Sequence, residues 1–402
     1  MAINIKNLQE RIQKKIFSVS PSTPTADLGD IVEAATLATG SLRQYDSAGL
    51  LPSVTSTQAQ IAYTKKDNAI KHKSANTTTW KTLTTDAYAH PVAPTPTSQG
   101  YQGDTYGFMS GGVNPGDAPN PGSTGPQSAF NIINRYTFAS ATNATDYGDL
   151  TAHRQYVSGA SSSTHGYSAG GGDGSQNSVN VIDKFAFSAA GNATDVGDLT
   201  VARYQLSGTQ SPTFGYAAGG YYLGPPSNYV TNIVDKFPFG SDGNASDVGD
   251  LTLARQYLTG TSSNDHGHAA GGTPTSGKRI DKYAFASDGN ATDVGDTVVE
   301  MEYLGANSPS SPTHGYIVSG HINTFEKFPF ASDGNSSDVA DLLQRTLYSA
   351  GANSEAFGFV AGGRTTSSYL NQIQKFSHTA DENSTDVADL TYSAEGGAGQ
   401  QV

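Results

Sequence analysis

The chain contains no cysteine, a single tryptophan and few charged residues, which make up 15% of its 402 positions. Without cysteine, neither disulfide bonds nor thiolate metal sites can stabilise the fold, and a disulfide-stapled secreted module is excluded. No run of about 18 apolar residues is present, so the sequence predicts no membrane-spanning helix. The first residues also lack the roughly 7 to 15 consecutive apolar residues of a secretory signal, and we therefore expect no export signal.

Charge is distributed unevenly along the chain. Residues 1–90 hold 10 Lys and Arg against 7 Asp and Glu, whereas residues 91–402 hold 13 against 29. An acidic body repels phosphate groups, so we expect no nucleic-acid partner. The contrast between the two parts predicts that they have different partners.

Glycine and tyrosine are abundant, with 46 and 21 copies, as is typical of an all-β protein with many tight turns. An aromatic or histidine ring followed by small residues and glycine recurs six times along the chain, at intervals of 59, 49, 52, 48 and 43 residues. The ring residues are Phe108, Tyr167, Tyr216, His268, Tyr316 and Phe359. Each copy continues with a variable polar stretch, an aromatic strand, an acidic turn and a further strand. Three or four short strands at such a period predict one blade of a β-propeller.

Six copies predict a six-bladed propeller over residues 100–402, unless the N-terminal part supplies a seventh blade. The segment from Asp389 onward resembles the strand that opens each blade, so we expect it to pair with residues 106–112 and close the ring. We expect the glycine pairs to let strands approach each other near the axis, the alternative being turns without a packing role. The loops after these pairs vary most in length, which predicts a contact surface at that rim.

The N-terminal part begins with an apolar pattern at helical spacing. Its members are Ile5, Leu8, Ile12 and Ile16. We interpret residues 1–40 as a helical anchor, residues 41–90 as a small β module and residues 91–99 as a proline-rich linker. Because one short helix is marginal alone, the apolar stripe predicts a partner, either a second copy or another protein; the alternative is that it folds back on its own domain.

Histidine and acidic residues offer two candidate metal sites. His165, His266 and His314 share a repeat position that Phe214 and Phe357 occupy in other copies, and Phe cannot ligate a metal. The acidic turns, such as residues 242–247, resemble the start of a calcium loop but lack its bidentate glutamate. We therefore favour packing and turn formation, and predict no metal site.

The remaining polar motifs also repeat with the blades, which is typical of structural residues. Asn-X-Ser/Thr occurs at Asn143, Asn192, Asn244, Asn290, Asn335 and Asn383, where a secreted protein would carry glycans; we interpret these as turn residues. Asp149, Asp198 and Asp250 each lie five residues before Arg154, Arg203 and Arg255, which predicts surface ion pairs within a blade worth about 0–1 kcal/mol. A glycosidase needs two facing carboxylates, and nothing pairs the non-repeating Glu300, Glu302 and Glu355, so we predict no catalytic residue and no cofactor.

The order of an Arg-bearing strand, an aromatic residue with a glycine pair, a variable loop and an aromatic strand resembles a degenerate kelch repeat. The resemblance covers about 300 residues and lacks the repeat tryptophan, since the only tryptophan is Trp80. Segments such as residues 280–296 are more similar still to repeats in virion proteins of marine bacteriophages, particularly cyanophages. Residues 51–83 also look like a small β module of phage tail and neck proteins.

The resemblance implies a non-enzymatic protein of the phage virion, assembled in the host cytoplasm and present as a homo-oligomer in the particle. The N-terminal region would anchor to other virion proteins, and the propeller would face outward as a tail fibre or tail-associated adhesin. Surface polysaccharide would then contact Tyr221, Tyr222 and Tyr229 in the long third loop. Two alternatives remain open: a purely structural capsid-decoration, neck or baseplate protein without receptor binding, and a cellular kelch-like scaffold.

Overall fold

The computed structural model describes residues 103–116, 129–175, 177–274, 277–318 and 320–402, together with four strands nearer the N-terminus. The chain divides into two compact units, residues 1–95 and residues 96–402. In the first unit, β1 (Arg43–Tyr45), β2 (Gln60–Thr64), β3 (Ala69–Lys73) and β4 (Lys81–Thr82) form one sheet in that order. The helical anchor expected within residues 1–40 lies outside the described residues. The described residues contain no helix that is long and apolar enough to cross a bilayer.

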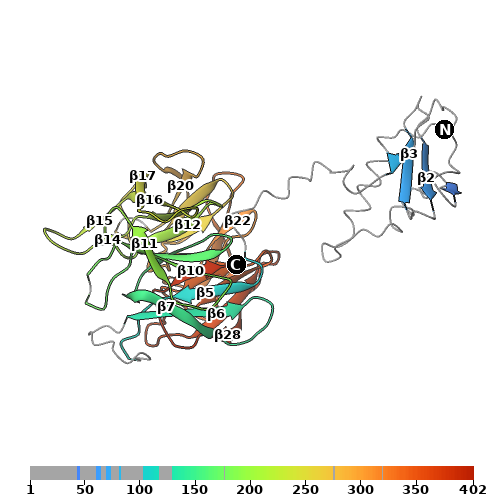
Figure 1. Cartoon of the computed structure of the whole chain (residues 1–402). Helices are drawn as coiled ribbons and strands as arrows, with labels where there is room; N and C mark the ends of the chain where they lie inside the picture. Colours follow the sequence, from blue (N-terminus) through green and yellow to red (C-terminus); the bar gives the residue numbers. More distant parts are fainter. Residues whose placement is uncertain are drawn as a thin grey trace. The chain divides into compact units, whose positions relative to one another are not determined.

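The second unit is an all-β propeller of six sheets, as the repeat predicts (Figure 1). The first blade holds β29 (Ala398–Gln401), β5 (Tyr106–Ser110), β6 (Phe130–Thr137) and β7 (Thr145–Arg154); the second holds β8 (Ser158–Ser161), β9 (His165–Ala169), β10 (Val181–Ala186) and β11 (Thr194–Asp198). The third holds β12 (Ser207–Gln210), β13 (Phe214–Ala218), β16 (Ile233–Pro238) and β17 (Ser246–Asp250), and β14 (Tyr221–Tyr222) pairs with β15 (Tyr229–Val230) in its loop. The fourth holds β18 (Thr259–Ser262), β19 (His266–Ala270), β20 (Arg279–Ala284) and β21 (Thr292–Asp296). The fifth holds β22 (His314–Ile317), β23 (Thr324–Pro329) and β24 (Ser337–Asp341), and the sixth holds β25 (Ala350–Asn353), β26 (Phe357–Ala361), β27 (Gln372–Ser377) and β28 (Thr385–Asp389).

The ring closes where the end of the chain meets its first blade. β29 pairs antiparallel with β5, Ala398 opposite Ser110 and Gln401 opposite Gly107. This confirms the predicted pairing of the C-terminal segment with residues 106–112. The sheet of the first blade thus combines β29 from the end of the chain with β5, β6 and β7 from the start of the propeller. Without β29, the inner edge of β5 would have no partner strand.

Neighbouring blades share their hydrophobic cores. Tyr167 of the second blade stacks on Phe239 of the third, with ring centroids 4.6 Å apart, and Tyr216 of the third stacks on Phe285 of the fourth at 4.8 Å. The third strand of each blade therefore buries residues on both of its faces, as in β10, where Ile182 and Phe185 are both inaccessible. This packing explains why the aromatic strand lacks clean polar alternation.

The antiparallel pairing gives the propeller two distinct faces. In the third blade, Ser207, Ala218 and Ile233 lie at one end of the sheet, while Gln210 and Phe214 lie at the other. We call the first end the tyrosine face; it carries the variable loops and the connections between blades. We call the opposite end the entry face, because the described chain enters the propeller there.

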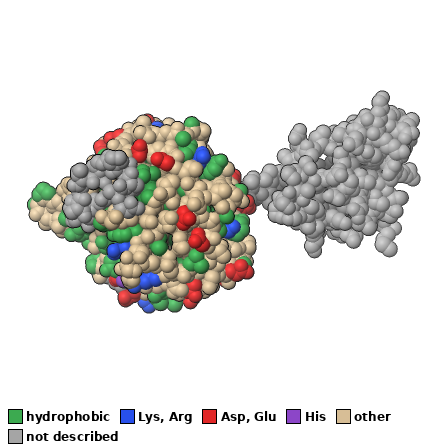
Figure 2. Space-filling view, turned by 90° about the horizontal axis from the view of Figure 1, so that it is seen from below, with side chains coloured by type: hydrophobic (Ala, Val, Ile, Leu, Met, Phe, Trp, Pro, Cys, Tyr) green, Lys and Arg blue, Asp and Glu red, His purple; other side chains and the backbone are tan. Residues whose placement is uncertain are grey.

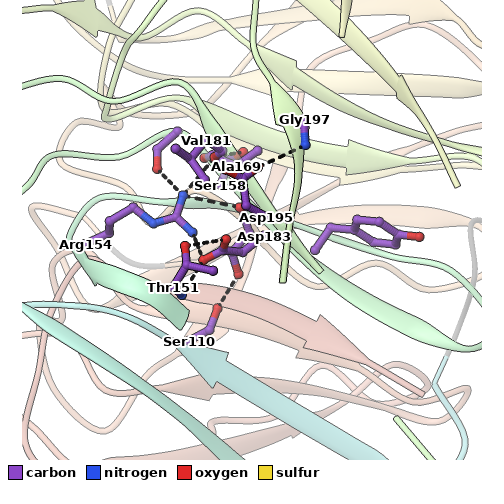
Figure 3. Close-up of polar contacts among 12 residues, drawn as sticks. Ser110, Thr151, Arg154, Ser158, Ala169, Val181, Asp183, Asp195 and Gly197 are labelled. Carbon is purple, nitrogen blue, oxygen red and sulfur yellow. Dashed lines mark hydrogen bonds and ion pairs between the residues drawn. The ribbon is translucent and has the colours of Figure 1, made fainter. Parts of the chain in front are cut away.

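The connections between blades are fixed by buried ion pairs, which corrects the expected pairing of Arg154, Arg203 and Arg255 with Asp149, Asp198 and Asp250. Each arginine instead pairs with an aspartate on the third strand of the following blade: Arg154 with Asp183, Arg203 with Asp235 at 3.1 Å, and Arg255 with Asp281 at 2.7 Å. All six side chains are at most 1% exposed, so these are not surface pairs. Figure 3 shows Arg154 reaching Asp183, which also accepts from the backbone N–H and hydroxyl of Thr151.

Where a connection lacks the arginine, the position of the partner aspartate also carries a different residue. Met301, Thr346 and Ala394 occupy the arginine position in the other three connections, and Glu326, Gln374 and Asn134 then replace the aspartate. Their side-chain oxygens still accept from the connecting backbone, as Gln374 does from Leu343 at 3.0 Å and Asn134 from Thr391 at 3.0 Å. A hydrogen bond from the connecting backbone is thus common to all six blades, whereas the buried pair of arginine and aspartate occurs in three.

The glycine pairs let backbones approach closely, and they do so at the connections between blades. Gly170 and Gly171 have φ of 66° and 106°, at the point where the second strand ends on the tyrosine face. A Cβ on Gly170 would lie 2.6 Å from the carbonyl oxygen of Arg203. The pairs therefore turn the chain beneath the connection that leads to the next blade.

The asparagines of the acidic turns bind the neighbouring blade. Asn192 Oδ1 accepts from the backbone N–H of Asp149 at 3.1 Å, and Asn143 accepts from Asp389 at 3.1 Å across the closure. The equivalent bonds of Asn244, Asn290, Asn335 and Asn383 measure 3.0–3.1 Å. Within the same turns, Asp195 accepts from the N–H of Gly197 two residues later. This geometry fits the turn interpretation, and it adds a bond between blades that the sequence did not indicate.

Candidate functional site

The centre of the tyrosine face is a closed ring of backbone hydrogen bonds around the axis. The N–H of Gln205 donates to the carbonyl of Tyr156, that of Tyr257 to Gln205, and that of Gly396 to Tyr348. Three further bonds from N–H to carbonyl complete the circle, at 2.6–3.2 Å: Tyr156 to Gly396, Leu304 to Tyr257, and Tyr348 to Tyr303. Five connections contribute one residue each and the connection to the fifth blade contributes Tyr303 and Leu304, so the ring is the point at which all six blades meet.

The ring residues adopt a left-handed backbone conformation, which side chains other than glycine rarely take. The φ values are 53° for Tyr156, 60° for Gln205, 58° for Tyr257, 60° for Tyr303 and 55° for Tyr348, and the sixth position is Gly396. Glycine would meet the backbone requirement at the least cost. Four of the six positions nevertheless carry tyrosine, so the aromatic side chain must contribute something that offsets this cost.

The tyrosines form a continuous aromatic surface that we call the tyrosine track. Ring centroids are 5.2 Å apart from Tyr156 to Tyr348, 5.3 Å from Tyr348 to Tyr257, and 5.2 Å from Tyr257 to Tyr303. From Tyr156 the track continues outward to Tyr204 at 6.2 Å, and from there to Tyr221 at 5.7 Å. Tyr348 is buried, while the other rings of the track are half-buried and so present part of their surface to solvent.

Charged groups beside the track are paired. The hydroxyl of Tyr156 donates to Glu395 Oε1 at 2.7 Å, and Arg364 Nε lies 2.7 Å from the other carboxylate oxygen. Burial raises the pKa of Glu395, while its bonds to Tyr156 and Arg364 act in the opposite direction. At the far side, His321 contacts Glu302 at 2.8 Å and Arg345 at 3.1 Å. The track is therefore an aromatic surface whose neighbouring charges are balanced.

The axis beneath the track is closed by Asn307. Residues 306–309 replace the first strand of the fifth blade, and the Asn307 side chain reaches the second and third blades. Its Nδ2 donates to the carbonyls of Gly159 and Gly208 at 2.8 and 3.0 Å, and its Oδ1 accepts from the N–H of Gly159 at 2.9 Å. The cavity between the tyrosines and the segment that ends at Ala306 holds no more than about one water molecule. A ligand on this face must therefore bind over the track and not within the axis.

The three tyrosines predicted from the sequence lie on this same face. β14 and β15 form a hairpin that projects from the propeller (Figure 1). Tyr222 and Tyr229 contact each other across it, with centroids 4.9 Å apart, and Tyr229 is 44% exposed. Tyr221 faces the propeller and joins the track through Tyr204. The anchor residues Ile5, Leu8, Ile12 and Ile16 lie outside the described residues.

The entry face differs in character. His165 and His314 bond the hydroxyls of Thr164 and Thr313 there, each at 2.8 Å. Lysines of one blade pair with aspartates of the next; Lys327, for example, lies 2.6 Å from Asp381. Within the described residues no three His, Asp or Glu side chains are grouped as metal ligands would be. Figure 2 shows a side of the propeller on which charged groups are scattered and no single charged patch forms.

Sequence reasoning missed the axial tyrosines and Asn307. A signal for the first was present, because Tyr156, Tyr257 and Tyr348 each precede a first-strand glycine by three residues. A signal for Asn307 was also present: Tyr303 and Gly315 are separated by 12 positions, whereas Tyr257 and Gly267 are separated by 10. Neither pattern identifies a ligand, since both also serve the closure of the ring.

Comparison of the chain with protein-family models and with curated proteins found no match.

Proposed function

We propose that this protein is a non-enzymatic virion protein of a bacteriophage that attaches the particle to a host surface. Residues 1–95 would bind other virion proteins, and the propeller would be displayed outward as a tail fibre or tail-associated adhesin, in several copies per particle. The similarity of the repeats to kelch repeats and to repeats of marine phage virion proteins supports this assignment.

One observation carries the proposal: the tyrosine face lies opposite the point where the chain enters the propeller. The N–H of Gly103 donates to the carbonyl of Asn353 at 3.0 Å, at the entry-face end of β25. Val402 bonds Tyr106 at the same end. Gly103, where the described part of the propeller begins, therefore lies at the end opposite the tyrosines and the variable loops.

The second candidate is a structural virion component without receptor binding. The closed axis and the bonds between every pair of neighbouring blades favour it, because they make the propeller a rigid body that could serve as a spacer or decoration. The two candidates differ in the place of the protein in the particle.

Immunogold labelling of intact virions with an antibody against residues 100–402 distinguishes them. Label on fibres or at the tail tip is the expected result. Label confined to the head or neck would overturn the attachment function and leave the structural one. Serum raised against an unrelated virion protein provides the control for labelling specificity.

A further inference from the structure

We infer that the tyrosine track is a binding site for an uncharged polysaccharide, which lies across the face from the β14–β15 hairpin to the axis. The inference rests on the proposed function and deepens it by assigning the ligand class and the residues. It adds Tyr204 and the axial tyrosines Tyr156, Tyr257 and Tyr303 to the hairpin pair Tyr222 and Tyr229.

The first argument is the retention of tyrosine at positions that favour glycine. The backbone ring requires positive φ, and Gly396 shows that glycine completes it without a side chain. Tyr156, Tyr257 and Tyr303 are half-buried residues, whereas Tyr348 is only 4% exposed. These three positions therefore combine the left-handed backbone with a residue that is not fully enclosed.

The second argument concerns the kind of ligand. A saccharide ring offers a C–H face, which packs on tyrosine rings, and hydroxyls, which bond phenolic oxygens and backbone groups. The carboxylates beside the track, Glu395 and Glu302, already have cationic or histidine partners at 2.7 and 2.8 Å. These two carboxylates therefore offer no unpaired charge to an acidic or basic sugar. The net negative charge of the propeller also disfavours a polyanionic ligand.

The third argument separates a saccharide from a protein partner. Protein interfaces centre on clusters of exposed apolar anchors. Among the described residues, the only large hydrophobic side chains that are strongly exposed are Tyr229, Val298 and Leu343, at 44%, 49% and 51%. Tyr229 lies on the hairpin beside the track, and no member of the track is among the three. A series of half-buried rings is suited to stacking on a flexible polar chain, and much less to burying another protein's core.

The test uses the full chain and two kinds of variant. Tyr222→Ala with Tyr229→Ala removes the exposed hairpin rings. Tyr257→Gly removes an axial ring and keeps the left-handed backbone, copying the arrangement at Gly396. Tyr283→Phe is the matched control, because Tyr283 is a buried core tyrosine whose hydroxyl bonds Thr209, away from the track. Circular dichroism and thermal unfolding verify that each variant is folded.

Binding is measured on an array of neutral and acidic oligosaccharides, and separately to cells of the bacterium that the virion infects. We expect the native protein and Tyr283→Phe to bind neutral oligosaccharides of several units. The hairpin double variant and Tyr257→Gly should each bind about tenfold more weakly, the loss of about 1.4 kcal/mol. Free neutral polysaccharide should compete with cell binding, and periodate treatment of the cells should abolish it.

The contrary outcomes separate the inference from the proposed function. Cell binding that is lost after protease and kept after periodate would indicate a protein receptor and overturn the saccharide assignment, while attachment would stand. Weakening by the hairpin variant alone would remove the axial tyrosines from the site. Binding to neutral oligosaccharides without binding to cells would retain the site and overturn attachment. Absence of both would overturn both.

Discussion

Asn307 donates a hydrogen bond of 2.8 Å to the carbonyl of Gly159 across the propeller axis, although the two residues are 148 positions apart. The same side chain accepts from the N–H of Gly159 and donates to Gly208. One amide thus satisfies three backbone groups of two other blades. Because Asn307 is 7% exposed, water cannot readily replace these bonds.

Asn307→Ala should therefore destabilise the whole propeller. It leaves one N–H and two carbonyls without their partner in a buried site, which should cost about 2–4 kcal/mol of unfolding free energy. Urea denaturation followed by circular dichroism measures the loss. Asn228→Ala is the control, since Asn228 bonds only the backbone of its own surface loop at Gly224. Equal stability of the two variants would show that the axial amide is dispensable.

The first strands of the blades pack backbone against backbone, so Gly208→Ala should also disrupt the ring. A Cβ at Gly208 would lie 2.2 Å from the carbonyl oxygen of Gly159, and no flexible side chain can move aside. We expect a loss of about 3 kcal/mol or failure to fold. Gly191→Ala, in an open turn with nothing within 4 Å, should leave the midpoint of thermal unfolding nearly unchanged. A folded, equally stable Gly208→Ala protein would contradict this account.

The buried pair of Arg203 and Asp235 can be compared with an arrangement that the chain itself uses. Arg203→Thr alone strands the Asp235 carboxylate in a site that is 0% exposed, and should cost about 3–5 kcal/mol. Adding Asp235→Gln reproduces the combination of Thr346 and Gln374 in the sixth blade. The double variant should recover much of the loss, because the glutamine oxygen can still accept from the connection. Urea unfolding of both single variants and the double variant gives the coupling free energy, and purely additive effects would argue against the exchange.

His268 should make stability depend on pH. It lies 3% exposed between aromatic side chains, and its pKa is lowered from 6.5 to about 3. Burial is the largest cause, His266 and Lys282 act in the same direction, and Asp333 acts in the opposite one. Between pH 6.5 and about 3 the unfolded chain binds a proton that the folded protein excludes, so this stabilisation is complete above pH 6.5 and is lost as the pH falls.

The matched change is His268→Tyr, because tyrosine occupies this position in Tyr167, Tyr216 and Tyr316. The native protein should lose on the order of 2–3 kcal/mol from this group between pH 7 and pH 4. The variant should lose correspondingly less, as measured by denaturant unfolding at each pH. Identical pH profiles for the two proteins would exclude His268 as the source.

The sequence allowed the number of blades and the ring closure to be predicted, because ring residues such as Tyr167 and Tyr216 mark one strand per blade. It did not reveal the partner of Arg154. Asp149 and Asp183 recur at equally regular positions, and only the path of the connection over the next blade selects Asp183. The loss of the first strand from the fifth blade escaped prediction for a related reason: two additional residues before Gly315 replace that strand, and their effect depends on bonds to distant blades.

Part of the candidate site was likewise within reach. The hairpin tyrosines were identified because one of the longer loops carries Tyr221, Tyr222 and Tyr229. The axial tyrosines were not, since repeated residues are easily taken for core. Their half-buried state and left-handed backbone become visible only when all six connections meet.

The entry of the chain at Gly103 has a mechanical consequence. Tension between the tyrosine face and the residues that precede Gly103 would pull β5 along its own length. β29 flanks β5 on one side and β6 on the other, and the hydrogen bonds to both run across the direction of pull. They would be loaded together in shear and would not open one after another, so the strand that bears the load is also the one best placed to resist it.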